Sequence, residues 1–324
     1  MSVPAVRHGL TIPFAGVSLA EHEPLVRRAD ELGYDDLWSG EATGYDGFTP
    51  LALASAWTEK VRLGTGVVNP YTRGPALMAQ SAAALADASR GRFVLGIGSS
   101  SDRIVERWNG IPFEKPLSRV REAVQALRPV FAGERGHGGF KLEAPPRQPI
   151  PIYVAALRGR MLRLAGEIGD GAWVNFLPLS GVEQVVGKVR EGEAAAGRQP
   201  GSVDIVCRFF NVPAPPDAGL AFVRFMFAAY ATVPVYAEYF RWLGFADEID
   251  PMVRAWEDGD RQRAVELVPE DLARDVFVFG GPDEQRERLA AYADRGITTL
   301  CLTPIAPPEA VPGWIEAMAP TPSR

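Results

Sequence analysis

The chain has 324 residues, of which 47% are hydrophobic and 23% charged, and its 34 basic and 40 acidic residues give a formal net charge of −6. This balance, without a long block of like charge, argues against a general affinity for nucleic acid or for an anionic membrane. Because no run approaches the ~20 apolar residues of a membrane span and the first residues lack a secretory signal, we expect a soluble, cytoplasmic protein.

One pattern recurs along the chain: a helical stretch, a glycine that ends it, and a short apolar run. It appears as ADELGYDDLW (29–38), ADASRGRFVLGIG (86–98), AGEIGDGAWV (165–174) and AYADRGITTLCL (291–302). A glycine just past a helix can adopt the left-handed conformation that ends it, and a buried strand follows naturally. Repeated alternation of helix and strand predicts a parallel sheet.

The sequence predicts eight strands, and this number favours a closed (β/α)8 TIM barrel, formed by one domain over 1–324, over an open doubly wound sheet. The expected strands are Val6–Ile12, Asp36–Trp38, Val61–Val67, Arg92–Ile97, Ile150–Ala155, Ala172–Val174, Val203–Phe210 and Ile297–Leu302.

Residues 213–281 interrupt this rhythm and predict a helical insertion between the seventh strand and its helix. The segment is rich in aromatic residues: Phe222, Phe225, Phe227, Tyr230, Tyr236, Tyr239, Phe240 and Trp242. Two interpretations are compatible with it, a subdomain that packs on the barrel or on another subunit, and an apolar lid over a pocket.

The cysteines and histidines predict neither a metal site nor a catalytic dyad. Cys207 and Cys301 lie far apart in apolar segments, so we expect buried, reduced thiols and no disulfide or zinc site. His8, His22 and His137 are expected to be structural or solvated rather than catalytic.

The stretch GIGSSSD, from Gly96 to Asp102, resembles a dinucleotide-binding fingerprint that lacks its third glycine. It follows the fourth strand instead of the first, and no acidic residue stands about 20 positions on to hold a ribose, so a dinucleotide site is not expected. At the carboxyl end of a barrel strand, Gly98 with Ser99, Ser100 and Ser101 would let a flat ligand or a phosphate approach the backbone. The alternative is an ordinary turn with a serine cap for the helix over 102–108.

Two further strand ends combine small and polar residues. Gly64 and Gly66 within the third strand predict a bulge or a close approach of the backbone to a ligand. Arg158, Gly159 and Arg160 begin a helix after the fifth strand, where free N–H groups favour an anion, and Arg73 would add charge. Three such loops at one barrel mouth predict an anionic, planar cofactor.

Together these residues resemble the bacterial luciferase-like family, and within it the branch that uses the deazaflavin coenzyme F420. The resemblance covers nearly the whole chain except the insertion. It is carried by GYDDLW, by the stretch from TPLALASAWTEK through VRLGTGVVNPYTRGPALMAQ to FVLGIGSS, by WNGIPFEKPLSRVREAVQALRPVFAGE, by PIYVAALRGRMLRLAGEIGDGAW and by GGPDEQRERLAAYADRGITTLCL.

The resemblance implies a (β/α)8 barrel that holds the coenzyme at the carboxyl-terminal mouth, with an insertion after the seventh strand and a dimeric assembly. It also implies a bulge with a non-proline cis peptide at Gly66–Val67. The cofactor-binding residues that it implies or that the loops predict are Thr65, Gly66, Val67, Asn69, Gly98, Ser99, Ser100, Ser101, Ala156, Leu157, Arg158, Gly159, Arg160 and Met161.

The chain departs from the family's dehydrogenases at their catalytic positions. Those enzymes have Asp-His after the second strand and a glutamate after the fourth, where this chain has Glu41-Ala42 and Ser101, so the dehydrogenase reaction is not transferred. Glu41, at a strand end, is our candidate for proton transfer or cofactor contact, with a salt bridge at the barrel rim as the alternative. The substrate-pocket candidates are Tyr45, Tyr71, Trp108, Asn175, Phe227 and Tyr230.

The resemblance leaves three hypotheses for function. The first is an F420-dependent oxidoreductase that transfers a hydride between the coenzyme and a fairly apolar small molecule. The second is an FMN-dependent monooxygenase on the same barrel, and the third is a barrel that binds a flavin or deazaflavin without catalysis.

Overall fold

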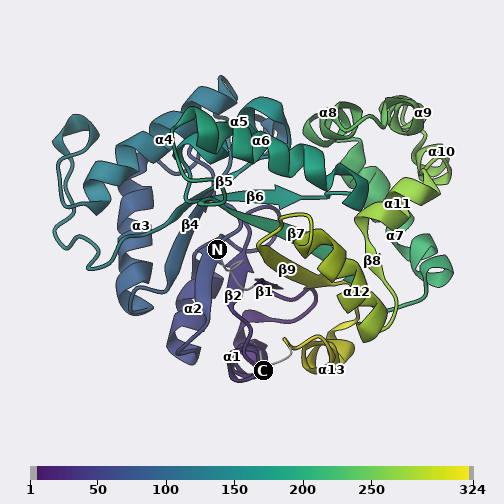
Figure 1. Cartoon of the computed structure of the whole chain (residues 1–324), viewed down its shortest axis with the longest axis horizontal. Helices are drawn as coiled ribbons and strands as arrows, with labels where there is room; N and C mark the ends of the chain where they lie inside the picture. The colour runs from purple at the N-terminus through teal and green to yellow at the C-terminus, as the bar shows by residue number, and fades with distance from the viewer. Residues whose placement is uncertain (1–5, 321–324) are drawn as a thin grey trace.

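Eight parallel strands form a closed barrel in the computed structural model, which describes residues 6–320 (Figure 1). Around the barrel the order is β1-β2-β3-β4-β5-β6-β7-β9, and β9 pairs with β1 to close it. The strands are β1 Arg7–Ile12, β2 Asp36–Ser39, β3 Arg62–Thr65, β4 Phe93–Ile97, β5 Ile152–Ala155, β6 Gly171–Asn175, β7 Asp204–Val212 and β9 Thr299–Pro304. The predicted TIM barrel is therefore confirmed.

Helices cover the outside of the barrel, and each follows its strand along the chain (Figure 1). Their apolar faces pack on the strands and make one continuous core. They are α1 Glu23–Glu31, α2 Thr49–Trp57, α3 Pro75–Ala88, α4 Pro116–Phe131, α5 Gly159–Ile168, α6 Val182–Ala195, α12 Pro282–Ala293 and α13 Val311–Ala317. Short helical turns lie at Leu19–Glu21, Arg103–Trp108, His137–Gly139, Leu179–Gly181 and Pro308–Ala310.

Five helices form the insertion between β7 and α12, and Figure 1 shows them gathered at one side of the barrel. They are α7 Pro216–Ala231, α8 Pro234–Trp242, α9 Ala246–Glu257, α10 Arg261–Glu266 and α11 Glu270–Val276. They enclose a second hydrophobic core. The two-residue strand β8, Val278–Phe279, then pairs with the end of β7, a strand that the sequence analysis missed because it is so short.

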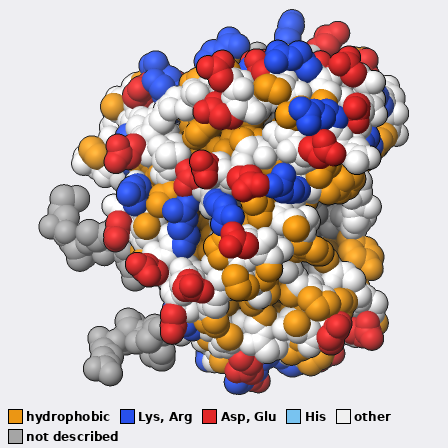
Figure 2. Space-filling view, turned by 90° about the vertical axis from the view of Figure 1, so that its right-hand side faces the viewer, with side chains coloured by type: hydrophobic (Ala, Val, Ile, Leu, Met, Phe, Trp, Pro, Cys, Tyr) orange, Lys and Arg blue, Asp and Glu red, His pale blue; other side chains and the backbone are white. Residues whose placement is uncertain are grey.

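No single helix among residues 6–320 is long and apolar enough to cross a membrane. The one pair that meets the criteria together, α7 with α8, is bent by 99°. Figure 2 views the molecule from the insertion side and shows hydrophobic side chains between charged ones across this face. Phe222 and Phe225 of α7 are exposed apolar side chains, at 66% and 61% exposed.

Large side chains fill the middle of the barrel. Trp38 and Trp173 lie with ring centroids 4.7 Å apart, and Gly64 leaves the room that the Trp38 ring occupies, since a Cβ there would come within 2.2 Å of it. The other members of this interior cluster are Val94, Tyr153, Val206 and Cys301. The barrel is therefore solid at its centre, as expected for this fold.

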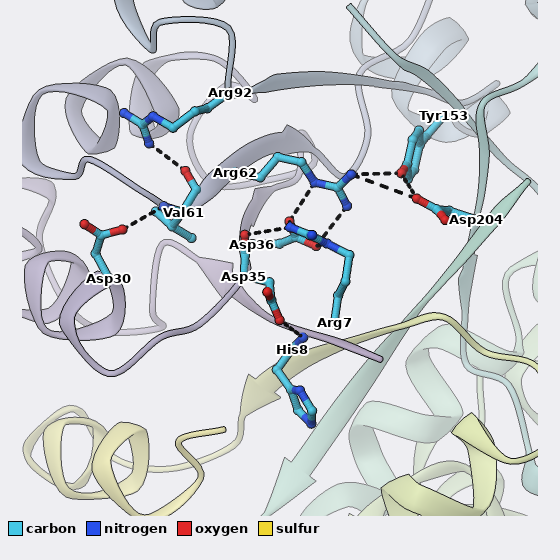
Figure 3. A network of polar contacts seen from close by, with 10 residues as sticks. All are labelled: Arg7, His8, Asp30, Asp35, Asp36, Val61, Arg62, Arg92, Tyr153 and Asp204. Carbon is cyan, nitrogen blue, oxygen red and sulfur yellow. Dashed lines mark hydrogen bonds and ion pairs between the residues drawn. The ribbon is translucent and has the colours of Figure 1, made fainter. Parts of the chain in front are cut away.

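An ion network closes the amino-terminal end of the barrel (Figure 3). The Asp36 carboxylate, with a side chain only 1% exposed, accepts two hydrogen bonds from Arg7 and two from Arg62. Arg62 also donates to the Tyr153 hydroxyl at 3.2 Å, and that hydroxyl donates to Asp204. The four charged residues are the first residues of β1, β2, β3 and β7, so their charges tie the strand starts together.

Both cysteines are buried, free thiols, as the sequence predicts. Burial raises the pKa of Cys301 to about 12 and that of Cys207 well above its usual value. Because the thiolate is the reactive form, we expect neither thiol to react with iodoacetamide at mildly alkaline pH in the folded protein, and both to react in concentrated urea. Mass spectrometry of the alkylated peptides measures this, and rapid labelling of the folded protein would contradict it.

Candidate functional site

The carboxyl-terminal mouth of the barrel is open. The residues that follow the interior cluster of Trp38 and Trp173 toward the carboxyl ends of the strands, and that face the barrel axis, are half-exposed. The residues just before them along the strands are buried. On the side of β2 to β5 the half-exposed positions are Gly40, Gly66 and Ala155, and on the side of β6, β7, β9 and β1 they are Asn175, Arg208, Thr303 and Thr11. The mouth therefore has a small-residue half and a polar half that face each other.

Close packing of β3 on β4 produces the small-residue half. Thr65 Oγ1 donates to the Gly96 carbonyl at 2.9 Å and accepts from the Gly96 N–H at 2.8 Å. A Cβ at Gly96 would lie 1.9 Å from the Thr65 carbonyl oxygen, and one at Gly98 would lie 2.7 Å from Val67. The expected bulge follows Thr65, where β3 ends earlier than predicted, and the Gly66–Val67 peptide is cis.

The three serines of the turn after β4 differ in their contacts. Ser101 Oγ accepts from the Ile104 N–H at 3.4 Å, so it caps the short helix Arg103–Trp108, as the alternative interpretation predicts. Ser100 has a left-handed backbone with φ of 62°, and its buried hydroxyl lacks a hydrogen-bond partner among residues 6–320. Ser99 is half-exposed beside it. Ser99 Oγ donates to the Ser100 carbonyl at 3.4 Å, and the binding of a ligand by these two serines stays a prediction.

The loop after β3 is held by its own side chains. Asn69 is 4% exposed, and its Oδ1 accepts from the N–H groups of Tyr71 and Thr72. The Tyr71 hydroxyl donates to the Glu114 carbonyl at 2.6 Å, which fixes the segment before α4. Tyr71 is 8% exposed, so the structure places it in loop packing and corrects its assignment to the substrate pocket.

Glu41 forms an ion pair with Arg73, across 32 positions of sequence, with an N–O distance of 2.7 Å. The Arg73 guanidinium also lies 3.5 Å from Asp46 and over the Phe48 ring. This is the rim salt bridge given above as the alternative to a catalytic role for Glu41, and the catalytic role stays a prediction. Since Arg73 is neutralised here, it does not supply the free charge expected of it.

A pocket of about 420 Å³ lies beside this ion pair. Tyr45 and Trp108, both 47% exposed, stand at its wall with Asn69 and Ile104. The loops after β2, β3 and β4 thus share one hollow at the rim of the mouth. The structure brings Tyr45 and Trp108 to one pocket, and their contact with a substrate stays a prediction.

The loop after β5 leads into the amino terminus of α5. Arg158 precedes the helix and pairs with Glu238 of α8 at 2.9 Å, while Arg160 is exposed and forms no ion pair within residues 6–320. The first N–H groups of a helix lack partners within it, so Gly159 and Arg160 can offer theirs to an anion. Ala156 is buried, and Leu157 and Met161 pack on the core with part of their surface exposed.

Aromatic residues of the insertion reach the polar half of the mouth. Asn175 Nδ2 donates to the Tyr236 hydroxyl at 3.1 Å, and the Tyr236 and Tyr230 rings pack against Phe176. Burial raises the pKa of Tyr236, so its hydroxyl stays protonated at neutral pH. Phe227 is fully buried in the insertion core beside Phe240, which corrects its assignment to the substrate pocket.

The histidines lie outside this site. His22 is 2% exposed, its Nε2 accepts from the Phe14 N–H, and its Nδ1 lies 2.7 Å from the Ser18 carbonyl. Burial lowers the pKa of His8, the second residue of β1. His137 lies in a short helical turn. His22 is therefore a structural residue, in line with the sequence analysis.

The sequence analysis missed three residues of the polar half. Arg208 Nε donates to Thr303 Oγ1 at 3.1 Å, and Thr303 in turn donates to Thr11 Oγ1 at 2.9 Å. The available signal was the position of Arg208 in a predicted strand, where alternation with Val206 and Phe210 places it on the inner face.

Comparison with known proteins shows the family. The model of the luciferase-like monooxygenase family matches residues 5–299. A Mycobacterium tuberculosis protein whose name assigns it provisionally as a coenzyme F420-dependent oxidoreductase is 30% identical, over 91% of this chain and 94% of its own length. The 5,10-methylenetetrahydromethanopterin reductase of Methanolobus tindarius is 28% identical, over 90% of this chain and 94% of its own.

A solved structure supports the same architecture. The coenzyme F420-dependent tetrahydromethanopterin reductase of Methanopyrus kandleri superimposes with a TM-score of 0.81 at 24% identity, over 97% of this chain and 98% of its own. The expected fold and the expected relationship therefore agree, and this chain belongs to the luciferase-like monooxygenase family.

Proposed function

We propose that the protein is an F420-dependent oxidoreductase, in which the reduced coenzyme supplies a hydride to a fairly apolar small molecule. The observation that carries this is the small-residue half of the mouth, where Gly40, Gly66 and Ala155 present no large side chain to a flat ring. The room beside Gly66 on the barrel side is filled by Trp173, so the ring would lie above that side chain. The F420-dependent relatives that match most of the chain support the choice of coenzyme.

Buried oxygens around the mouth fit a ring edged by N–H and C=O groups. Ser100 Oγ after β4 and Asn175 Oδ1 at the end of β6 have no hydrogen-bond partner among residues 6–320. A buried polar atom without a partner costs about 1–3 kcal/mol, which a ligand that bonds to it recovers. The start of α5, with Arg158 and Arg160, suits an anionic tail.

The protein's own residues would bind, orient and shield the reactants. The small-residue half holds the ring, the insertion covers the opposite side, and Tyr230 and Tyr236 give that side an apolar wall with one protonated hydroxyl. The proton that accompanies the hydride needs a donor, for which Glu41 and the Tyr236 hydroxyl are the two candidates at the rim. The lid role of residues 213–281 belongs to this proposal.

Titration of the protein with oxidised F420, followed by the fluorescence of the coenzyme, tests the proposal. We expect saturable quenching, and at least about a tenfold weaker affinity in Ala155→Phe, because the ring at 155 fills the space above the central cluster. Ala290→Phe, on the exposed face of α12, is the matched control and should bind like the parent protein. Saturable binding of FMN instead of F420 would favour the monooxygenase hypothesis, and equal binding by A155F would contradict this site.

A further inference from the structure

Arg208 is a cation at the open end of the barrel with unused hydrogen-bond donors. Its Nε is bonded to Thr303, but within residues 6–320 its two terminal nitrogens have no acceptor, and no carboxylate oxygen lies within 4.0 Å of them. The side chain is half-exposed, so solvent reaches it from the mouth.

The polar half holds this guanidinium in a fixed place. Thr303 Oγ1 accepts a hydrogen bond from the Arg208 Nε–H, and its own hydroxyl donates to Thr11 Oγ1. The guanidinium carbon lies 4.6 Å from the centre of the Phe210 ring. Stacking on Phe210 and the bond to Thr303 define the plane of the group. The edge with the terminal nitrogens is therefore left for another partner.

The arginines at the amino-terminal end of the barrel and at the rim pocket are neutralised. Arg7 and Arg62 share Asp36, and Arg73 is paired with Glu41. A half-buried guanidinium without an anion loses hydration and gains no ion pair, which is unfavourable until an anion binds. Arg208 differs from these three arginines, because it has no acidic partner among residues 6–320.

A second unsatisfied group lies beside it. Asn175 is paired with Arg208 in the β6–β7 ladder, and its buried Oδ1 has no hydrogen-bond partner among residues 6–320. Asn175 Nδ2 donates to the Tyr236 hydroxyl, and the Tyr236 ring packs against that of Tyr230. One cation beside one neutral amide suits a singly charged group better than a phosphate dianion.

We infer that Arg208 binds a carboxylate of the substrate, so that the substrates are small apolar molecules carrying one carboxylate. The planar fork of a guanidinium matches the two oxygens of a carboxylate, which adds geometry to charge. A carboxylate fixed at β7 lies across the mouth from the small-residue half, with the apolar body of the molecule between them. That the carboxylate belongs to a substrate rests on the proposed function, whereas the binding of a carboxylate to Arg208 does not.

Calorimetric titration of the full-length protein without coenzyme tests the inference, with 3-phenylpropanoate as the probe and 3-phenylpropanamide as its neutral counterpart. We expect saturable binding of the carboxylate and at least about tenfold weaker binding of the amide. The Arg208→Gln variant should lose affinity for the carboxylate by a similar factor. The carboxylate affinity of Arg208→Lys should lie between those of the parent protein and Arg208→Gln, because lysine keeps the charge but lacks the planar fork of the guanidinium. Arg254→Gln, at an exposed position on α9, is the control and should bind normally.

A measurement without substitution guards against variants that fail to fold. Phenylglyoxal should modify Arg208 in the unsubstituted protein, and 3-phenylpropanoate should protect it, as read from the modified peptide by mass spectrometry. Equal affinity for carboxylate and amide, unchanged binding by R208Q, or no protection would overturn the inference. So would a loss of F420 affinity in R208Q, which would place Arg208 in the coenzyme site. A failure of F420 to bind while carboxylate binding depends on Arg208 would refute the proposed function alone.

Discussion

Replacing Gly96 with alanine is expected to destabilise the protein by more than about 4 kcal/mol, enough to abolish soluble expression or coenzyme binding. The new Cβ would lie 1.9 Å from the Thr65 carbonyl oxygen, a distance that only a shift of β3 or β4 can relieve. Both strands are buried here, and Thr65 is bonded twice to Gly96, so the shift would also break those bonds. The midpoint of thermal unfolding and the yield of soluble protein measure the effect.

Gly74→Ala is the matched control for this substitution. Gly74 precedes α3 with φ of −61°, and a Cβ there would meet nothing within 4 Å. We expect G74A to change the stability by less than about 0.5 kcal/mol. If G96A unfolds within about 1 kcal/mol of G74A, the close approach of β3 to β4 is not what requires glycine at this position.

The second large effect is expected at Asp36. Asp36→Asn should lower the free energy of unfolding by about 3–5 kcal/mol, because it leaves Arg7 and Arg62 without the buried charge that they share. The side chain keeps its size, so the loss reports the charge and its hydrogen bonds instead of a cavity. Urea unfolding followed by tryptophan fluorescence gives the free energy.

An exposed ion pair gives the comparison for D36N. Glu23 and Arg27 on α1 are 46% and 51% exposed and stand one helical turn apart. Pairs of this kind contribute about 0.3–0.5 kcal/mol, so Glu23→Gln should have little effect on the free energy of unfolding. Equal stability of D36N and E23Q would show that the amino-terminal network does not hold the strand starts together.

The barrel could be predicted from the sequence because its signals are local. A glycine that ends a helix and an apolar run that follows it define each unit within a short stretch, as ADASRGRFVLGIG does before β4. The end of β3 was predicted too late, because the bulge at Gly66 breaks the pairing after Thr65 while the apolar sequence continues. The strand β8 has only two residues, too few for any periodicity.

The candidate site was harder to predict, because its contacts join residues far apart in the chain. The Glu41–Arg73 ion pair gives no signal in either segment alone, and the partner of Tyr71 is a backbone carbonyl. Phe227 and Tyr230 lie on the same helix and have the same aromatic character, yet only the first is enclosed in the insertion core. Composition predicts an aromatic insertion, whereas the side that each ring faces depends on tertiary packing.

The glycines of GIGSSSD gain a different meaning from the structure. Gly96 and Gly98 serve the contact between β3 and β4, and this contact positions the turn at Ser99 and Ser100, whose role in ligand binding stays a prediction. This turn is also where the chain differs from the family's dehydrogenases, since Ser101 caps a helix where they carry an acid.

The pairing of β8 with the end of β7 allows the insertion to vary independently of the barrel. The chain leaves the barrel at Val212 and returns at Val278–Phe279, and Val212 and Phe279 are partners in the ladder. Exit and return therefore coincide in space, so helices can be added, removed or exchanged between them without moving a barrel strand. The five helices and the aromatic side chains that they carry can therefore be replaced as a unit while the eight barrel strands stay in place.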